Sequence, residues 1–218
     1  MAIVLTTELV ELRKAILTMG AAVEQRINQA IQAMLQHDHA AAETVRAGDD
    51  EIDEMEVRIE QECLRVLALS HPVAGDLRFI LAVMRINGNL ERIADHAHSI
   101  AKRVLDLEHL PAIKIPDALI KMIDETRQMF TGALKALADE NSELARKVRR
   151  ADQRVDDLQK EIFAWVRQEI INNVESSDAV IDLLSVARKL ERIADVSTNI
   201  AEDVIFVTEG AVVRHERE

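Results

Sequence analysis

Cysteine, proline, glycine and aromatic residues are all scarce in this sequence. Its 218 residues include one cysteine, three prolines, six glycines, one tryptophan, four phenylalanines and no tyrosine. Because Cys63 stands alone, no intramolecular disulfide can form and a cysteine-rich zinc site is excluded. A composition poor in helix breakers and rich in alanine, leucine and glutamate favours helices. We therefore expect an all-α protein that lies in the cytoplasm, a compartment where disulfides are rare.

Basic residues and long apolar runs are also in short supply. The 27 Lys and Arg residues are outnumbered by 39 Asp and Glu residues, which gives a formal net charge of -12. Proteins that bind nucleic acid need a basic surface for the phosphates, so we expect no nucleic-acid partner. The apolar start at residues 2–5 is broken by Glu8 and Glu11 before it reaches the length of a signal peptide or membrane span. We predict a soluble protein that does not span a membrane.

The familiar catalytic motifs are missing as well. The sequence has no Walker motif, no Gly-x-Ser-x-Gly and no His-Glu-x-x-His, so we expect no enzyme of those classes. A carboxylate-bridged di-iron bundle enzyme would carry Glu-x-x-His on two helices. No glutamate here is followed three residues later by a histidine, which makes that enzyme the less favoured alternative.

Apolar residues recur at steps of three and four, the period of an α-helix, in six stretches of the chain. Asp38 and Ser142 can cap the second and fifth helices, and Pro72 suits the first turn of the third. Pro111 and Pro116 mark a linker between the third and fourth helices. The stretches cover about residues 5–36, 38–70, 72–107, 119–137, 142–172 and 183–207. We predict two tandem, similar antiparallel three-helix bundles, at residues 1–109 and 116–210.

One six-residue motif, Leu-Glu-Arg-Ile-Ala-Asp, occurs twice. It covers residues 90–95 and returns one hundred positions later at residues 190–195, and the similarity continues to Val104 and Val204. Each copy places two carboxylates four residues apart, where they share one helix face and repel each other by a few tenths of a kcal/mol. A bound cation would turn this repulsion into attraction.

A second set of acid pairs lies on the preceding helices, where Asp49 pairs with Asp53 and Asp152 with Asp156. In each half, the two acid pairs lie a similar number of residues before and after the turn that joins their helices, near residue 71 in the first half and residue 175 in the second. At a rise of about 1.5 Å per residue, the two pairs are level along the helix axes to within about one turn. Each half can therefore form a carboxylate cluster between two antiparallel helices. Such oxygen ligands suit Mg, Ca, Mn or Fe better than copper or structural zinc. The predicted metal ligands are Asp49, Asp53, Glu91, Asp95, Asp152, Asp156, Glu191 and Asp195.

The alternative is a helical scaffold protein with no metal site. In a helical chain this rich in acids, pairs four residues apart are frequent and mostly form a solvated face. Arg92 and Arg192 could then serve as ion-pair partners for acids on neighbouring helices. Such surface pairs contribute little stability.

The repeated motif, with His96-Ala97 after its first copy and Asn199-Ile200-Ala201 after its second, resembles the signature of the PhoU family of phosphate-signalling regulators. Residues 72–78, with the pattern Pro-x-Ala-x-Asp-Leu-Arg, are similar to the segment that opens the family's third helix. Small departures are Ala94 and Ala194 in place of Gly, Ser99 in place of Asn, and Val196-Ser197 in place of His-Ala.

The resemblance implies a non-enzymatic cytoplasmic regulator that negatively controls phosphate uptake and phosphate-starvation signalling. It implies divalent or ferric metal ions, such as Mg, Mn or Fe, on the acidic motifs. The implied partners are the phosphate-specific ABC transporter, chiefly its ATPase subunit, and a membrane sensor histidine kinase. The sequence leaves open which metal is bound and whether two copies form a homodimer.

Overall fold

The protein is almost entirely helical in the computed structural model, which describes residues 2–48, 50–107 and 113–213. The helices are α1 (Ala2–Gln36), α2 (His39–Ala47), α3 (Asp50–Ser70), α4 (Ala74–Asp106), α5 (Asp117–Ala138), α6 (Ser142–Asn172) and α7 (Ser177–Glu209), with a 3-10 turn, η2, at Val174–Ser176. No strand occurs in these residues. The all-α prediction is confirmed, with α2 and α3 forming the two parts of the expected second helix.

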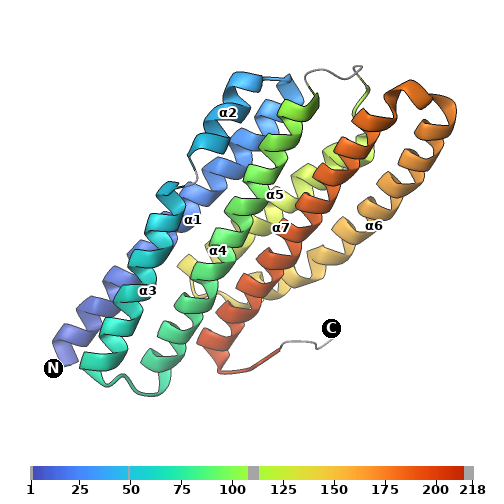
Figure 1. Cartoon of the computed structure of the whole chain (residues 1–218). Helices are drawn as coiled ribbons and strands as arrows, with labels where there is room; N and C mark the ends of the chain where they lie inside the picture. Colours follow the sequence, from blue (N-terminus) through green and yellow to red (C-terminus); the bar gives the residue numbers. More distant parts are fainter. Residues whose placement is uncertain (1, 49, 108–112, 214–218) are drawn as a thin grey trace.

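The helices α4 and α7 lie side by side at the centre of the molecule and join its two halves (Figure 1). In the first half α4 also packs against α1, α2 and α3, and in the second half α7 packs against α5 and α6. The outer helices α3 and α6 flank the central pair on opposite sides. Within the described residues, no helix has both the length and the apolar character needed to cross a membrane.

A continuous apolar core runs through both halves. On α4, Ile86, Leu90 and Ile93 are fully buried, and on α7 Leu190 and Ile193 are fully buried as well. These residues follow one another at steps of three and four, which keeps them on one helix face. Full burial of each such side chain contributes about 1.5–3 kcal/mol.

Two ion pairs fix the direction of α7 relative to α4. Arg85 Nη1 lies 3.1 Å from Asp203 Oδ1, and Arg103 Nη1 lies 3.3 Å from Asp182 Oδ1. An early residue of α4 therefore meets a late residue of α7, and the reverse holds at the other end, so the helices are antiparallel. Halfway between the two ion pairs lie Ala94 on α4 and residues 192–193 on α7. The two copies of the six-residue motif thus lie opposite each other at the centre of the molecule.

The predicted cap of the second helix is confirmed, since Asp38 Oδ1 accepts a hydrogen bond of 2.9 Å from the Ala41 backbone N–H. The helix ends sooner than predicted, and α2 stops at Ala47. The buried Arg26 of α1 donates a hydrogen bond to the carbonyl of Gly48, at the C-cap position of α2. This side chain satisfies a carbonyl at the break between α2 and α3.

Two other predicted helix starts are wrong. The fifth helix is capped by Asn141, whose Oδ1 accepts a bond of 2.9 Å from the Leu144 N–H, while Ser142 is the first residue of α6. Asn141 has the extended backbone typical of an N-cap, with φ -104° and ψ 95°, and Asp38 is similar, with φ -90° and ψ 93°. Pro72 lies in the connection before α4, which begins at Ala74 after an extended residue.

Candidate functional site

The first carboxylate cluster lies between α3 and α4 and consists of Asp53, Glu56, Glu91 and Asp95. Burial raises the pKa of Glu91, and the negative charges of Asp95, Glu56 and Asp53 raise it further. The pKa of Glu56 is also raised, first by burial and then by the carboxylates of Glu60, Asp53 and Asp95. Glu91 thus responds to the other three carboxylates, and Glu56 responds to the two aspartates.

Asn87 links α3 and α4 at the height of this cluster. This residue is 2% exposed, and its Nδ2 donates a hydrogen bond of 2.9 Å to the Glu56 carbonyl. Glu91 follows Asn87 by about one turn, while Asp53 precedes Glu56 by about one turn on an antiparallel neighbour. The bond thus keeps the acids of the two helices at the same height.

The structure brings together three of the four ligands predicted for the first half, namely Asp53, Glu91 and Asp95. Asp49 lies outside the described residues. Glu56 was missed, because only acids four residues apart were paired and Glu56 follows Asp53 by three. Residues at both spacings share a helix face, so a search at i+3 would have found it.

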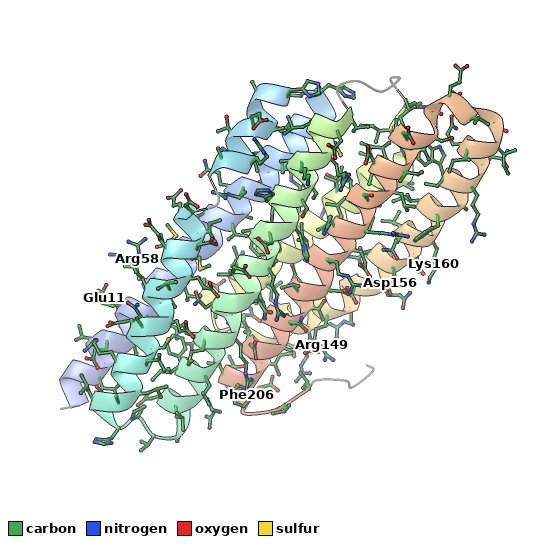
Figure 2. The ribbon with its side chains drawn as sticks, viewed as in Figure 1. Glu11, Arg58, Arg149, Asp156, Lys160 and Phe206 are labelled. Carbon is green, nitrogen blue, oxygen red and sulfur yellow. The ribbon has the colours of Figure 1, made fainter. Side chains whose placement is uncertain are left out.

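The second carboxylate cluster lies between α6 and α7 and contains all four ligands predicted for the second half. Burial raises the pKa of Asp152 from its usual 3.8 to about 6, with further increases caused by the charges of Asp195, Asp156 and Glu191. The pKa values of Glu191 and Asp195 are also raised, chiefly by burial. In Figure 2, Asp156 and Lys160 mark the stretch of α6 that runs beside α7.

The two clusters differ in their arginines. Arg192 lies 3.1 Å from Asp195 Oδ2 and 3.5 Å from Glu191 Oε2, so it partly neutralises the second cluster from within its own motif. No ion pair of Arg92 is found among the residues that the structure describes. The ion pairs with neighbouring helices that the scaffold alternative offered for these two arginines are not found among the described residues, since Arg192 pairs with acids of its own helix.

The donor chemistry of both clusters fits a hard cation. The neighbouring carboxylates help to raise the pKa values of Glu56, Glu91 and Asp152, and a cation placed among them would relieve this repulsion. In the described part of the chain, however, no three His, Cys, Asp or Glu side chains converge closely enough to surround one metal ion. The metal site therefore stays a prediction.

Comparison with known proteins connects these motifs to one family. The family model described as PhoU domain matches residues 16–104 and 119–204. A phosphate-specific transport system accessory protein PhoU homolog of Pseudomonas putida is 35% identical over 95% of this chain and 82% of its own length. The accessory protein PhoU of Escherichia coli is 32% identical over 95% of this chain and 86% of its own length.

Solved structures give the same result for the fold. The crystal structure of PhoU from Pseudomonas aeruginosa has a TM-score of 0.88 at 33% identity, and covers 94% of this chain and 99% of its own. The regulatory protein PhoU from Streptococcus pneumoniae has a TM-score of 0.89 at 28% identity, and covers 96% of this chain and 99% of its own.

Proposed function

The chain belongs to the PhoU family, and from this premise we propose that it is an accessory regulatory protein of a phosphate-specific transport system. The observation that supports this most is the match of the family model to both halves, together with relatives that align over nearly the whole chain. In this proposal the protein restrains phosphate uptake and phosphate-starvation signalling when phosphate is abundant.

The protein acts in this proposal by binding in the cytoplasm and catalyses no reaction. Its curated relatives are named as accessory proteins of the transport system. The partners we propose are the ATPase subunit of the phosphate ABC transporter and a membrane sensor histidine kinase. The family resemblance is what supports both partners.

We also propose that each carboxylate cluster binds divalent or ferric cations. Asp53, Glu56, Glu91 and Asp95 would hold the cation of the first cluster. Asp152, Asp156, Glu191 and Asp195 would hold that of the second. A bound cation supplies positive charge, and the side chains supply oxygen ligands from two helices, so binding would hold each outer helix against its central neighbour.

The regulatory role is tested by deleting the gene and measuring a phosphate-starvation reporter in phosphate-rich medium. We expect the reporter to be active in the deletion strain and silent again when the wild-type gene is restored. A silent reporter in the deletion strain would contradict the regulatory role. Co-purification of the transporter's ATPase subunit, with and without phosphate and metal, tests the partner directly.

The metal site has a separate test. Replacement of Glu91, Asp95, Glu191 and Asp195 by Ala should lower the metal content of the purified protein, measured by mass spectrometry. Asp157→Ala is the matched control, because this exposed acid adjoins Asp156 but pairs with Lys160 at 2.7 Å. Equal metal content in all variants would favour the alternative, a helical scaffold with no metal site, without affecting the reporter result.

A further inference from the structure

A pocket of about 550 Å³ lies in the groove between α4 and α7, apart from both carboxylate clusters. Its lining includes Arg85, Gly88, Asn89 and Arg92 from α4, and Asn199 and Glu202 from α7. Gly88, Asn89 and Arg92 follow Arg85 by three, four and seven residues, so all four positions lie on one face of α4. The volume falls within the range of about 300–1,000 Å³ common for ligand pockets.

The positive charge of this pocket comes partly from Arg92, whose ion pairing differs from that of Arg192 in the second motif copy. Arg192 is held by two carboxylates of its own motif. Its counterpart Arg92 is exposed and lines the pocket. Among the described residues, Arg92 forms no ion pair. The same motif position thus forms two ion pairs in the second half, whereas in the first half its guanidinium lines the pocket and acts on Glu91 only through its charge.

The remaining charges around the pocket are matched with one another. Glu202 Oε1 lies 3.4 Å from Arg149 Nε of α6, so this carboxylate of the pocket lining already has a cationic partner. The bond from Arg85 to Asp203 uses one of five guanidinium N–H donors, and Arg85 also lies over the ring of Phe206 at 5.1 Å. These contacts fix the position of Arg85 beside the pocket. Figure 2 labels Arg149 and Phe206 at this end of α7.

Gly88 keeps the pocket open. A glycine inside a helix costs about 0.5–1 kcal/mol relative to alanine. A Cβ on Gly88 would have no neighbouring atom within 4 Å, so close packing does not explain this glycine. The equivalent position one hundred residues later is Arg188, whose guanidinium lies 5.4 Å from the centre of the Phe163 ring. A side chain of that size at position 88 would enter the pocket.

We propose that this pocket binds an anion with two or three linked phosphoryl groups. Arginine forks donate paired hydrogen bonds to phosphate oxygens, and the amide groups of Asn89 and Asn199 add neutral donors. Arg85 and Arg92 are separated by seven residues, or about 10.5 Å along the helix axis. A span of that length suits a chain of phosphoryl groups better than a single small anion. The chain can come from inorganic polyphosphate or from a nucleoside triphosphate.

The proposal is tested by titration calorimetry on the full-length protein in a chelating buffer at low ionic strength. Sodium tripolyphosphate and ATP are the two probes, and they separate the inorganic source from the nucleotide source. We expect at least one of them to bind, and orthophosphate to bind more weakly. Arg92→Ala should weaken binding about tenfold or more, since a lost charge-assisted bond has about this effect. Gly88→Leu should weaken it at least as much by filling the pocket.

Arg192→Ala is the matched control, because it removes the same residue type from the other motif copy. It should change the affinity less than about twofold if the pocket is the site. The proposal is overturned if neither probe binds the wild-type protein, if orthophosphate binds as tightly as tripolyphosphate, or if Arg192→Ala weakens binding as much as Arg92→Ala. Retained binding by Gly88→Leu would also overturn it. Circular dichroism verifies that each variant is folded, and the chelator keeps this result independent of the metal sites.

Discussion

Replacing Asp152 by Asn should make the metal-free protein more stable at pH 8. In the folded protein Asp152 has a pKa of about 6 against a usual 3.8, because it is half-buried and faces Asp195, Asp156 and Glu191. Between these two values the folded state binds more protons than the unfolded state, so stability falls as the pH rises. Protonation of Asp152 contributes fully to the stability of the folded state below about pH 3.8, and this contribution is lost as the pH rises through about 6. At pH 8 the charged Asp152 is therefore a cost that Asn removes.

The stability gain expected for Asp152→Asn follows from the raised pKa of Asp152 in the folded protein. About two pKa units at about 1.4 kcal/mol each give an upper limit of about 3 kcal/mol. Because the side chain is only half-buried, solvent screening reduces this to about 1–2 kcal/mol. At about 2–4 °C per kcal/mol for a chain of this length, the melting temperature should rise by about 2–8 °C.

Thermal and urea unfolding with a chelator present, at pH 5 and pH 8, measure this effect. The gain for Asp152→Asn should be larger at pH 8 than at pH 5. Asp157→Asn serves as the control, because this neighbouring acid is exposed and pairs with Lys160, so it should give no gain. An unchanged or lower stability of Asp152→Asn at pH 8 would refute the reasoning from charge repulsion. If a cation binds here, added Mn should stabilise the wild type more than Asp152→Asn.

Three further predictions concern other parts of the molecule. Asn87→Ala should lower the free energy of unfolding by about 1–3 kcal/mol in urea titrations, because it removes the buried bond to the Glu56 carbonyl; an unchanged midpoint would contradict this. The Cys63 thiol should not react with a thiol reagent at pH 8 until the protein unfolds, since burial raises its pKa to about 11 and leaves no exposed sulfur; rapid reaction of the folded protein would be the contrary result. Leu90→Ala should cost about 2–5 kcal/mol, measured by chemical denaturation, because Leu90 is fully buried; a cost below about 1 kcal/mol would count against the packing described.

The sequence was sufficient to predict the long helices and, for the acids that the structure describes, which of them lie at the same height on neighbouring helices, because both follow from the constant rise and period of a helix. The break between α2 and α3 was not predictable in this way. Val45 and Ile52 are both buried and seven residues apart, so the apolar period continues across it. The break also involves Arg26, whose bond to Gly48 joins residues that lie far apart in the sequence.

The pocket between α4 and α7 was not predictable from the repeat, because the repeat draws attention to what the two copies share. The pocket depends on positions where the copies differ, such as Gly88 and Arg188. It also requires knowing that Arg192 pairs within its motif while Arg92 does not, which only tertiary structure reveals.

The antiparallel contact between α4 and α7 involves a position at which the two similar halves carry opposite charges. Position 203 of the second half corresponds to Arg103 of the first, so one half carries an acid where the other carries a base. Two copies of the first half, joined in this geometry, would place Arg85 against Arg103. Two copies of the second half would place Asp203 against Asp182. The exchanged charges therefore favour pairing between unlike halves and disfavour pairing between like ones.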